Sequence, residues 1–194
     1  MPYAKSVETK RRLLQTTGEL MRVNGYHATG LSEIIEVSGV PKGSLYHHFP
    51  DGKEELAAAA IRSGGDWVVD SLRRMIERGG TVAAGVAAFC DHYAAELERS
   101  DFSRGCPLAT VTLESNAAVE PVRDAAGVAF AAIVGVLANA IEAEGVTRER
   151  ALRLASLAVS ALEGALILVR AIRDTSHLAM VRDHLTVLLE EATA

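Results

Sequence analysis

The chain has few cysteines, which could form disulfides, few prolines, which would interrupt helices, and few aromatic residues. Among its 194 residues it has two cysteines, Cys90 and Cys106, together with five prolines and one tryptophan, and aromatic residues make up 5%. Two cysteines are too few for a disulfide framework and suit a reducing cytoplasm. Scarce aromatics and abundant alanine favour close-packed helices over a β-sandwich. Few prolines and no low-complexity tract argue against extensive disorder.

Long apolar runs and catalytic motifs are also lacking. The longest apolar run, 125–138, is too short and too rich in glycine and alanine for a membrane span, so we interpret it as a buried helix. No charged-then-apolar leader opens the chain, which predicts a cytoplasmic protein without a membrane partner. No phosphate-cradling glycine loop or nucleophile elbow is present, and Cys90-Asp91-His92 has no second Cys/His pair at zinc spacing. We therefore expect no enzyme, no metal and no cofactor.

A net excess of positive charge is found at one end of the chain only. The net charge is −5, yet residues 1–53 hold seven basic against five acidic residues, a charge of +2, so the remainder carries −7. All four lysines lie in this first portion. A basic head on an acidic body is typical of a protein whose head alone meets DNA. A solvated basic face without a partner is the alternative.

Two short helical patterns lie on either side of Gly39. Leu31, Ile34 and Ile35 recur at helical spacing, and Thr29 is expected to cap their helix. Gly39 provides a positive-φ stop, and Pro41 suits the first turn of the next helix. Two short helices joined by a glycine turn predict a helix-turn-helix, whose second helix enters the major groove of DNA. An ordinary helical hairpin with a polar face is the alternative.

The second of these helices is ended by Pro50-Asp51-Gly52. Leu45 and Phe49 are four apart, so they share a face that can anchor the helix to its own domain. Its remaining surface has hydrogen-bond donors and flat rings without an acidic residue, which suits a polyanion: Lys42, Ser44, Tyr46, His47 and His48. Gly43 leaves backbone N–H groups at the helix start open to a phosphate.

These residues carry a family resemblance. The chain resembles the DNA-binding domain of the TetR family in Gly25-Tyr26 followed by Thr29, in Val40-Pro41-Lys42-Gly43-Ser44-Leu45-Tyr46-His47-His48-Phe49, and in Lys53-Glu54-Glu55-Leu56. The match covers roughly residues 5–60. Further on, Ser103-Arg104-Gly105-Cys106-Pro107-Leu108 with Leu113-Glu114 resembles the LmrA/YxaF-like branch, which is linked to multidrug-efflux control. One departure is the link 50–52, which is one residue longer than is common in the family.

The resemblance and the helix composition together imply a DNA-contact set. We expect Lys42 and His47 to matter most for base recognition, with Ser44 next. Tyr46 and the Gly43 backbone complete the contacts from this helix. Three further residues are expected mainly on phosphates: Thr29, His48 and Lys53.

The whole chain reads as an all-α protein of nine helices. Residues 1–52 are predicted to form the DNA-binding domain and 53–194 a helical ligand-binding and dimerisation domain. The expected helices cover approximately 6–23, 31–38, 42–49, 52–78, 81–99, 108–115, 122–144, 147–174 and 176–190. Gly64-Gly65 marks either a bend in the fourth helix or a point of close packing.

The last two helices are predicted to pair with their symmetry mates in a homodimer. They carry apolar stripes at Leu154, Leu157, Ala158, Ala161, Ala165, Leu168 and Ile172, and at Leu178, Val181, Leu185, Leu188 and Leu189. The resemblance implies the same arrangement, while packing within one chain is the alternative for any single residue. His177 and His184 are interpreted as surface or interface residues.

Apolar and amphipathic residues of the body can line a pocket for a small hydrophobic effector. The candidates are Trp67, Met75, Phe89, Tyr93, Cys106, Leu108, Phe130, Ile133, Glu163 and Leu166. An ionised Glu163 within an apolar run needs a partner or solvent. It either faces the cavity and orients a ligand or pairs with an arginine such as Arg170 across the dimer. Cys106, close to Arg104, is also a candidate redox switch.

The sequence therefore predicts a ligand-responsive, homodimeric repressor that binds a near-palindromic double-stranded operator. An architectural DNA-binding protein without ligand control is the alternative, and a small-molecule enzyme with a vestigial helix-turn-helix is a second one.

Overall fold

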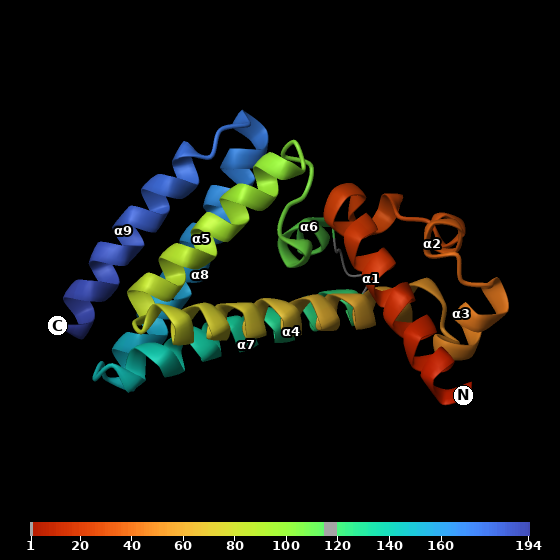
Figure 1. The fold of residues 1–194 in the computed structure, drawn as a ribbon, viewed down its shortest axis with the longest axis horizontal. Coiled ribbons are helices and arrows are strands. Elements are labelled where there is room, and N and C mark those ends of the chain that lie inside the picture. Colours follow the sequence, from red (N-terminus) through yellow and green to blue (C-terminus); the bar gives the residue numbers. More distant parts are fainter. Residues whose placement is uncertain (1, 115–119) are drawn as a thin grey trace. The chain divides into compact units, whose positions relative to one another are not determined.

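The structure is a computed structural model that describes residues 2–114 and 120–194, with side chains from residue 6 onward. Within these ranges the chain forms nine α-helices and no strand, which confirms the predicted all-α class (Figure 1). The helices are α1 Pro2–Ala28, α2 Leu31–Ser38, α3 Lys42–His48, α4 Lys53–Gly79, α5 Val82–Arg99, α6 Pro107–Glu114, α7 Glu120–Ala143, α8 Arg148–Ile172 and α9 Ser176–Thr193.

The chain folds into two compact units. Unit 1 comprises residues 1–65 and 107–129, and unit 2 comprises 66–106 and 130–194. Helices α4 and α7 contribute to both units. The domain boundary predicted between residues 52 and 53 falls at the start of α4, inside unit 1, so the first turns of α4 group with α1–α3.

Unit 1 is organised around α1, which packs against α2, α3 and α6. Its core cluster includes Leu13 of α1, Ile34 of α2 and Leu45 of α3, each no more than 1% exposed. The close-packing interpretation of the glycine pair in α4 is supported, because a Cβ on Gly65 would lie 2.5 Å from the Cβ of Ala129. A methyl group at residue 65 would therefore push α4 away from α7 in this unit.

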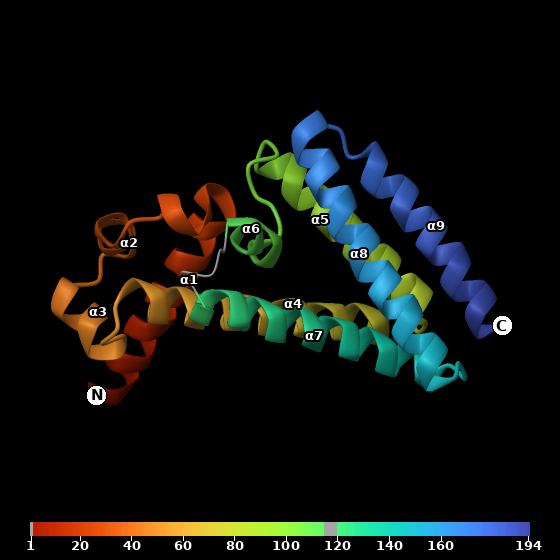
Figure 2. The ribbon, with the colours of Figure 1, turned by 180° about the vertical axis from the view of Figure 1, so that it is seen from behind.

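Unit 2 contains α5, α8 and α9, of which α9 packs against both α5 and α8. The three helices run beside one another in both views (Figures 1 and 2). The second half of α4 approaches α5 closely at Gly85, where a Cβ would lie 2.5 Å from Ile76 Cγ1 and 2.6 Å from its Cα. Glycine at residue 85 therefore allows the backbone of α5 to pack directly against Ile76 of α4.

The helix ends test the capping predictions. Thr81 caps α5, with its hydroxyl oxygen accepting a hydrogen bond from the N–H of Ala84 at 3.2 Å. The cap assigned to Thr29 was wrong: Gly30 is the N-cap of α2 and offers no side chain. The Thr29 hydroxyl instead donates to the carbonyl of Gly25 at 2.7 Å. Thr147 is the N-cap of α8 but makes no side-chain cap hydrogen bond.

Helix α1 is longer than the predicted range 6–23. It begins at Pro2 and continues to Ala28, with a local break at Gly25, where φ is 79° and ψ is −179°. Helical turns resume after this glycine because its backbone alone leaves the α region. The predicted end of the sixth helix at residue 115 lies outside the described residues.

Two helices, α7 and α8, are long and apolar enough to cross a membrane by length and composition alone. The predicted run 125–138 lies within α7, so its interpretation as too short for a span does not hold for the helix as a whole. Core helices of soluble proteins pass the same test, and α7 contains buried residues such as Ala126, Leu137 and Ile141.

Candidate functional site

The turn between α2 and α3 has the geometry that the sequence predicted. Gly39 adopts φ 61° and ψ 22°, and its N–H donates to the carbonyl of Glu36 at 3.3 Å, which ends α2. Pro41, with φ −58°, directly precedes α3. The Arg12 guanidinium donates to the carbonyl of Ser38 and ties this end of α2 to α1. These contacts fix the turn that joins the two short helices.

The inner face of α3 anchors the helix, as predicted. Leu45 of α3 and Phe49, the C-cap residue directly after it, are 0% and 2% exposed and belong to the core cluster with Val40 and Leu56. Burying these two side chains fixes which face of α3 remains outside, since residues four apart lie on one side of a helix.

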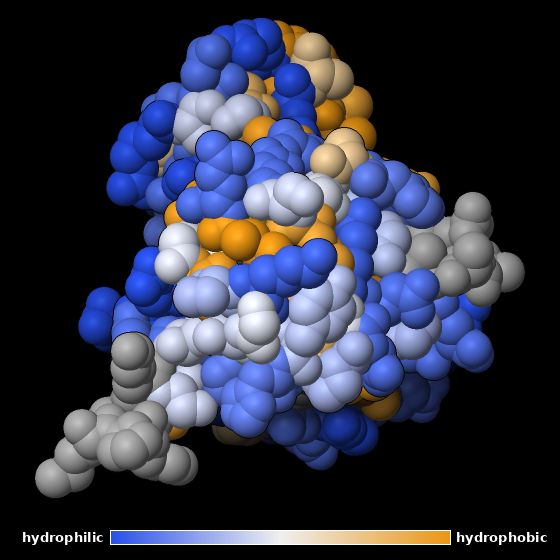
Figure 3. Space-filling model, turned by 90° about the vertical axis from the view of Figure 1, so that its right-hand side faces the viewer, coloured by the Kyte–Doolittle hydropathy of each residue, from blue (hydrophilic) through white to orange (hydrophobic). Residues whose placement is uncertain are grey.

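The outer face of α3 carries the predicted DNA-contact residues. Lys42, Tyr46 and His47 are exposed, and Ser44 and His48 are half-buried. Gly43 is exposed, and a Cβ built on it meets nothing within 4 Å, so a ligand can approach its backbone. Figure 3 shows hydrophilic and intermediate side chains covering most of the face on which α2 and α3 lie. The arrangement is a cationic, ring-bearing surface without a carboxylate from α3 itself.

Lys10 of α1 also belongs to this surface, although it was not among the residues predicted to contact DNA. Its Nζ lies 5.8 Å from the ring centroid of Phe49. Burial lowers the pKa of His48, and the charges of His47 and Lys10 lower it further. The basic run 10–12 was the available signal, but only the fold brings Lys10 beside α3, while Arg11 is engaged by Glu8.

Two predicted phosphate contacts have partners within unit 1. Thr29 is fully buried. Lys53 is half-buried, with Nζ 4.3 Å from the ring centroid of Tyr26 and 3.4 Å from the carbonyl oxygen of His27. Burial lowers the pKa of Lys53, and the charge of Glu114 acts in the opposite direction. Both roles on DNA stay predictions.

A pair of short helices with a glycine turn, an apolar inner face and a basic outer face defines a helix-turn-helix DNA-binding protein. The pattern of the bacterial regulatory proteins of the tetR family matches residues 13–60, and that of the LmrA/YxaF-like transcriptional regulator C-terminal domain matches 82–184. The chain therefore belongs to the TetR family of bacterial transcriptional regulators, in its LmrA/YxaF-like branch.

Relatives match over nearly the whole chain. The uncharacterised HTH-type transcriptional regulator YxaF of Bacillus subtilis is 30% identical over 184 residues, which are 95% of this chain and 96% of that protein. LmrA of the same organism is 27% identical over 94% of this chain and 97% of its own. Among solved structures, reduced Escherichia coli NemR superposes with a TM-score of 0.81 at 23% identity, covering 92% of this chain and 95% of that chain. This last likeness supports the fold.

The predicted effector-pocket residues divide between the two units. Nine of them lie in unit 2, whereas Leu108, which is fully buried, lies in unit 1. Phe89 and Tyr93 of α5 are buried with ring centroids 5.0 Å apart. Trp67 is 47% exposed and lies 5.8 Å from the His92 ring.

The remaining apolar candidates of unit 2 are mostly enclosed. Ile133 of α7 and Leu166 of α8 are buried, and Met75 and Phe130 are half-buried. These side chains belong to the apolar interior of the unit, which is also where core residues lie.

Glu163 on α8 is the unusual polar group of unit 2. The residue is half-buried, but its Oε2 is fully buried and has no hydrogen-bond partner among the described residues. Burial raises the pKa of Glu163 to about 7, although a hydrogen bond with Cys106 lowers it in part. The Arg170 proposed as its partner across a dimer donates to the carbonyl of Ser103 within the chain, at 3.2 Å.

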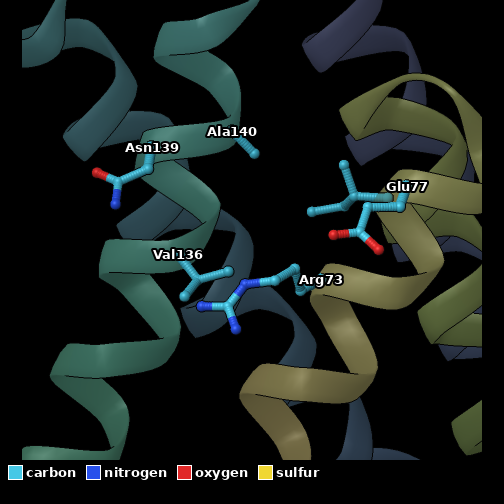
Figure 4. A pocket seen from close by; sticks show the side chains of 6 residues that line it. Arg73, Glu77, Val136, Asn139 and Ala140 are labelled. Atoms are coloured by element: carbon cyan, nitrogen blue, oxygen red, sulfur yellow. The ribbon is translucent and has the colours of Figure 1, made fainter.

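A pocket of about 240 Å³ opens between the unit-2 parts of α4 and α7 (Figure 4). Arg73 and Glu77 come from α4, and Val136 and Asn139 come from α7. None of these residues was predicted to bind a ligand, because charged residues on helix surfaces carry no pocket signal in the sequence. The pocket combines a cation, an anion and an amide above apolar walls.

The thiols offer little chemistry. Burial, together with the charge of Asp91, raises the pKa of Cys90 to about 12, so this thiol stays protonated. Cys90 and Cys106 are both buried and free. Within the described ranges, no three His, Cys, Asp or Glu side chains gather as a metal site.

Proposed function

We propose that this regulator is a homodimeric repressor that binds a near-palindromic operator and is released by a small hydrophobic effector. The observation that carries the DNA-binding mode is the division of α3 into a buried face, with Leu45 and Phe49, and an exposed face led by Lys42 and His47. Because its buried face is packed in the core of unit 1, α3 can enter the major groove without a rearrangement of its own domain.

Each DNA-facing residue has a role suited to its chemistry. Lys42 and His47 read base edges, with Ser44 next. Tyr46 and the Gly43 backbone approach from the same face, and Lys10 adds a positive charge beside His48. His48 and Lys53 act mainly toward phosphates, whereas Thr29, which is fully buried with its hydroxyl bonded to the Gly25 carbonyl, supports this contact only by fixing the backbone before α2.

Dimerisation through α8 and α9 is supported by their uncovered apolar side chains. Half of the large hydrophobic residues that are exposed in the described chain lie on these two helices: Leu152, Leu157, Ile167, Leu168, Ile172, Met180 and Val187. A groove of about 390 Å³ runs between the helices. It is lined mainly by apolar side chains, among them Leu157 and Ala161 of α8 and Val181 and Leu188 of α9. A two-fold pair would present recognition helices about 34 Å apart, or at a multiple of the helical repeat.

Effector control rests on unit 2. Its enclosed apolar residues suit a hydrophobic molecule, and the unpartnered Oε2 of Glu163 suits a hydrogen-bond donor on that molecule. A ligand changes the conformational equilibrium only by its differential affinity for two states, and about 1–3 kcal/mol of coupling is typical. The protein acts in the cytoplasm, where its operator is located.

Selection of bound sequences from random duplexes, repeated with hydrophobic effectors, tests the proposal. We expect one two-fold-related sequence to be enriched and its binding to weaken with an effector. Binding that barely depends on sequence and responds to no effector would instead indicate an architectural protein.

A further inference from the structure

The end of α6 is joined to the end of α1 by a contact across 87 residues. Glu114, the last residue of α6, accepts a hydrogen bond from the N–H of His27 through Oε2 at 3.0 Å. Its carbonyl oxygen lies 3.3 Å from His27 Nε2. Both residues belong to unit 1, in which α6 packs against α1.

The contact lies where α1 breaks. Gly25 has φ 79° and ψ −179°, so the turn 26–28 begins afresh after it. N–H groups at a helical start have no partner in the preceding turn, and a carboxylate is a favourable acceptor for them. Glu114 therefore acts as a cap supplied from another helix.

Glycine at residue 25 serves this cap as well as the break. A Cβ on Gly25 would lie 1.7 Å from Oε1 of Glu114, so any side chain there would displace the carboxylate. The carbonyl of Gly25 in turn accepts the hydroxyl of Thr29, which leads into α2. The residues on both sides of the break are thus fixed.

The same corner reaches α4. Lys53, its first residue, donates to the carbonyl of His27 and lies over the Tyr26 ring, and the charge of Glu114 raises its pKa against the effect of burial. The corner at residues 25–29 therefore connects to the segments that enter α2 and α4, on either side of the helix-turn-helix.

We propose that Glu114 is a positioning residue for operator recognition: its carboxylate caps the corner at residues 25–29 through the His27 N–H and so fixes the orientation in which α2 and α3 meet DNA. The inference rests on the proposed operator binding by α3. Glu114 itself contacts no base.

A double-mutant cycle between residues 25 and 114 tests this role, using the full-length protein and the duplex selected by the wild type. Glu114→Ala removes the acceptor, and we expect operator affinity to fall about tenfold, the size of a lost charged hydrogen bond. Gly25→Ala should weaken binding at least as much. Because each change breaks the same contact, the double variant should bind no worse than about twofold below Gly25→Ala.

Two matched variants separate positioning from general damage. Gly80→Ala places alanine at another positive φ, 74°, where its Cβ meets nothing within 4 Å, so it reports backbone strain alone. Glu114→Gln keeps an oxygen that can accept from His27 and should recover most of the affinity. The His27 amide proton signal should shift upfield in Glu114→Ala and stay close to wild type in Glu114→Gln.

The ratio of operator to random-duplex affinity is decisive. The role of Glu114 is supported if this ratio falls in Glu114→Ala while helicity is unchanged. It is overturned if the ratio stays within twofold of wild type, if the two single changes are additive, or if Glu114→Gln is as weak as Glu114→Ala. A wild type that selects no sequence would overturn the proposed operator binding as well, whereas a normal wild-type selection confines any failure to Glu114.

Discussion

The polar groups on the exposed face of α3 are solvated, whereas the carboxyl group of Glu163 on α8 is buried. Lys42 and His47 keep their polar groups in solvent, where charge costs little, and are placed by the apolar residues behind them. Glu163 in unit 2 is enclosed, with one oxygen unpartnered and a raised pKa. Unit 1 thus has a ready binding surface for a polyanion, whereas unit 2 holds a group that gains from any partner that reaches it.

The largest effect is expected at the apolar surface of unit 2. Leu157→Glu places a charge in the α8–α9 groove at a side chain that is 53% exposed in the single chain. In a two-fold pair the charge appears twice in a desolvated contact, so we expect at least a hundredfold weaker dimer by sedimentation, and about 3 kcal/mol or more per pair. Helicity should be retained. Arg153→Ala, on an exposed part of α8, is the control, and an unchanged dimer in Leu157→Glu would remove this groove from the interface.

The next effect concerns the buried carboxyl. The pKa of Glu163 is raised from 4.5 to about 7, so the folded state holds a proton that the unfolded chain has already released in this interval. Stability from this group therefore falls as pH rises from 4.5 to 7 and stays low above it. Glu163→Gln should match the wild type near pH 4 and exceed it by up to about 3 kcal/mol at pH 8, measured by urea unfolding.

Comparing the free energy of unfolding of Glu163→Gln with that of the wild type at both pH values provides an internal control. A stability difference that is equal at pH 4 and pH 8 would contradict the raised pKa. If the effector donates a hydrogen bond to this carboxyl, Glu163→Leu, which has no acceptor, should lose effector response while remaining dimeric, whereas Glu163→Gln keeps an acceptor oxygen.

On the DNA-binding face, Lys42→Ala should reduce operator affinity by about 1–3 kcal/mol, because a base contact is lost. The side chain is exposed, so the free energy of unfolding should change by less than about 0.5 kcal/mol. Fluorescence anisotropy with a labelled duplex measures the effect. Equal affinity in the variant and the wild type would exclude Lys42 from the contacts.

The smallest expected effect is a difference in the salt dependence of DNA binding between variants of two lysines of unit 1, Lys10 and Lys53. If Lys10 neutralises one phosphate, Lys10→Ala should lower the slope of log affinity against log salt by about one unit. Lys53→Ala should lower it by less unless DNA binding frees its Nζ from His27 and Tyr26. Equal loss of slope in both variants would show that Lys53 is released on binding.

The sequence predicted what is encoded by neighbouring residues. The turn at Gly39 and the buried pair Leu45 and Phe49 depend on residues within a few positions of one another, and both are confirmed. The cap at Thr29 failed for an instructive reason. A threonine before a helix has a second option, the carbonyl freed by the break at Gly25, and spacing alone does not distinguish the two acceptors.

The amino-acid sequence by itself determined the all-α class, the family and the polar face of α3, because periodicity and local turn chemistry act over short stretches of chain. Only the tertiary structure decided that Lys10 lies beside His48, that Cys106 meets Glu163, and that Glu114 caps the corner at His27. These partners are tens of residues apart. Their pairing follows from the packing of whole helices, which sets where each side chain finds its nearest donor, acceptor or charge.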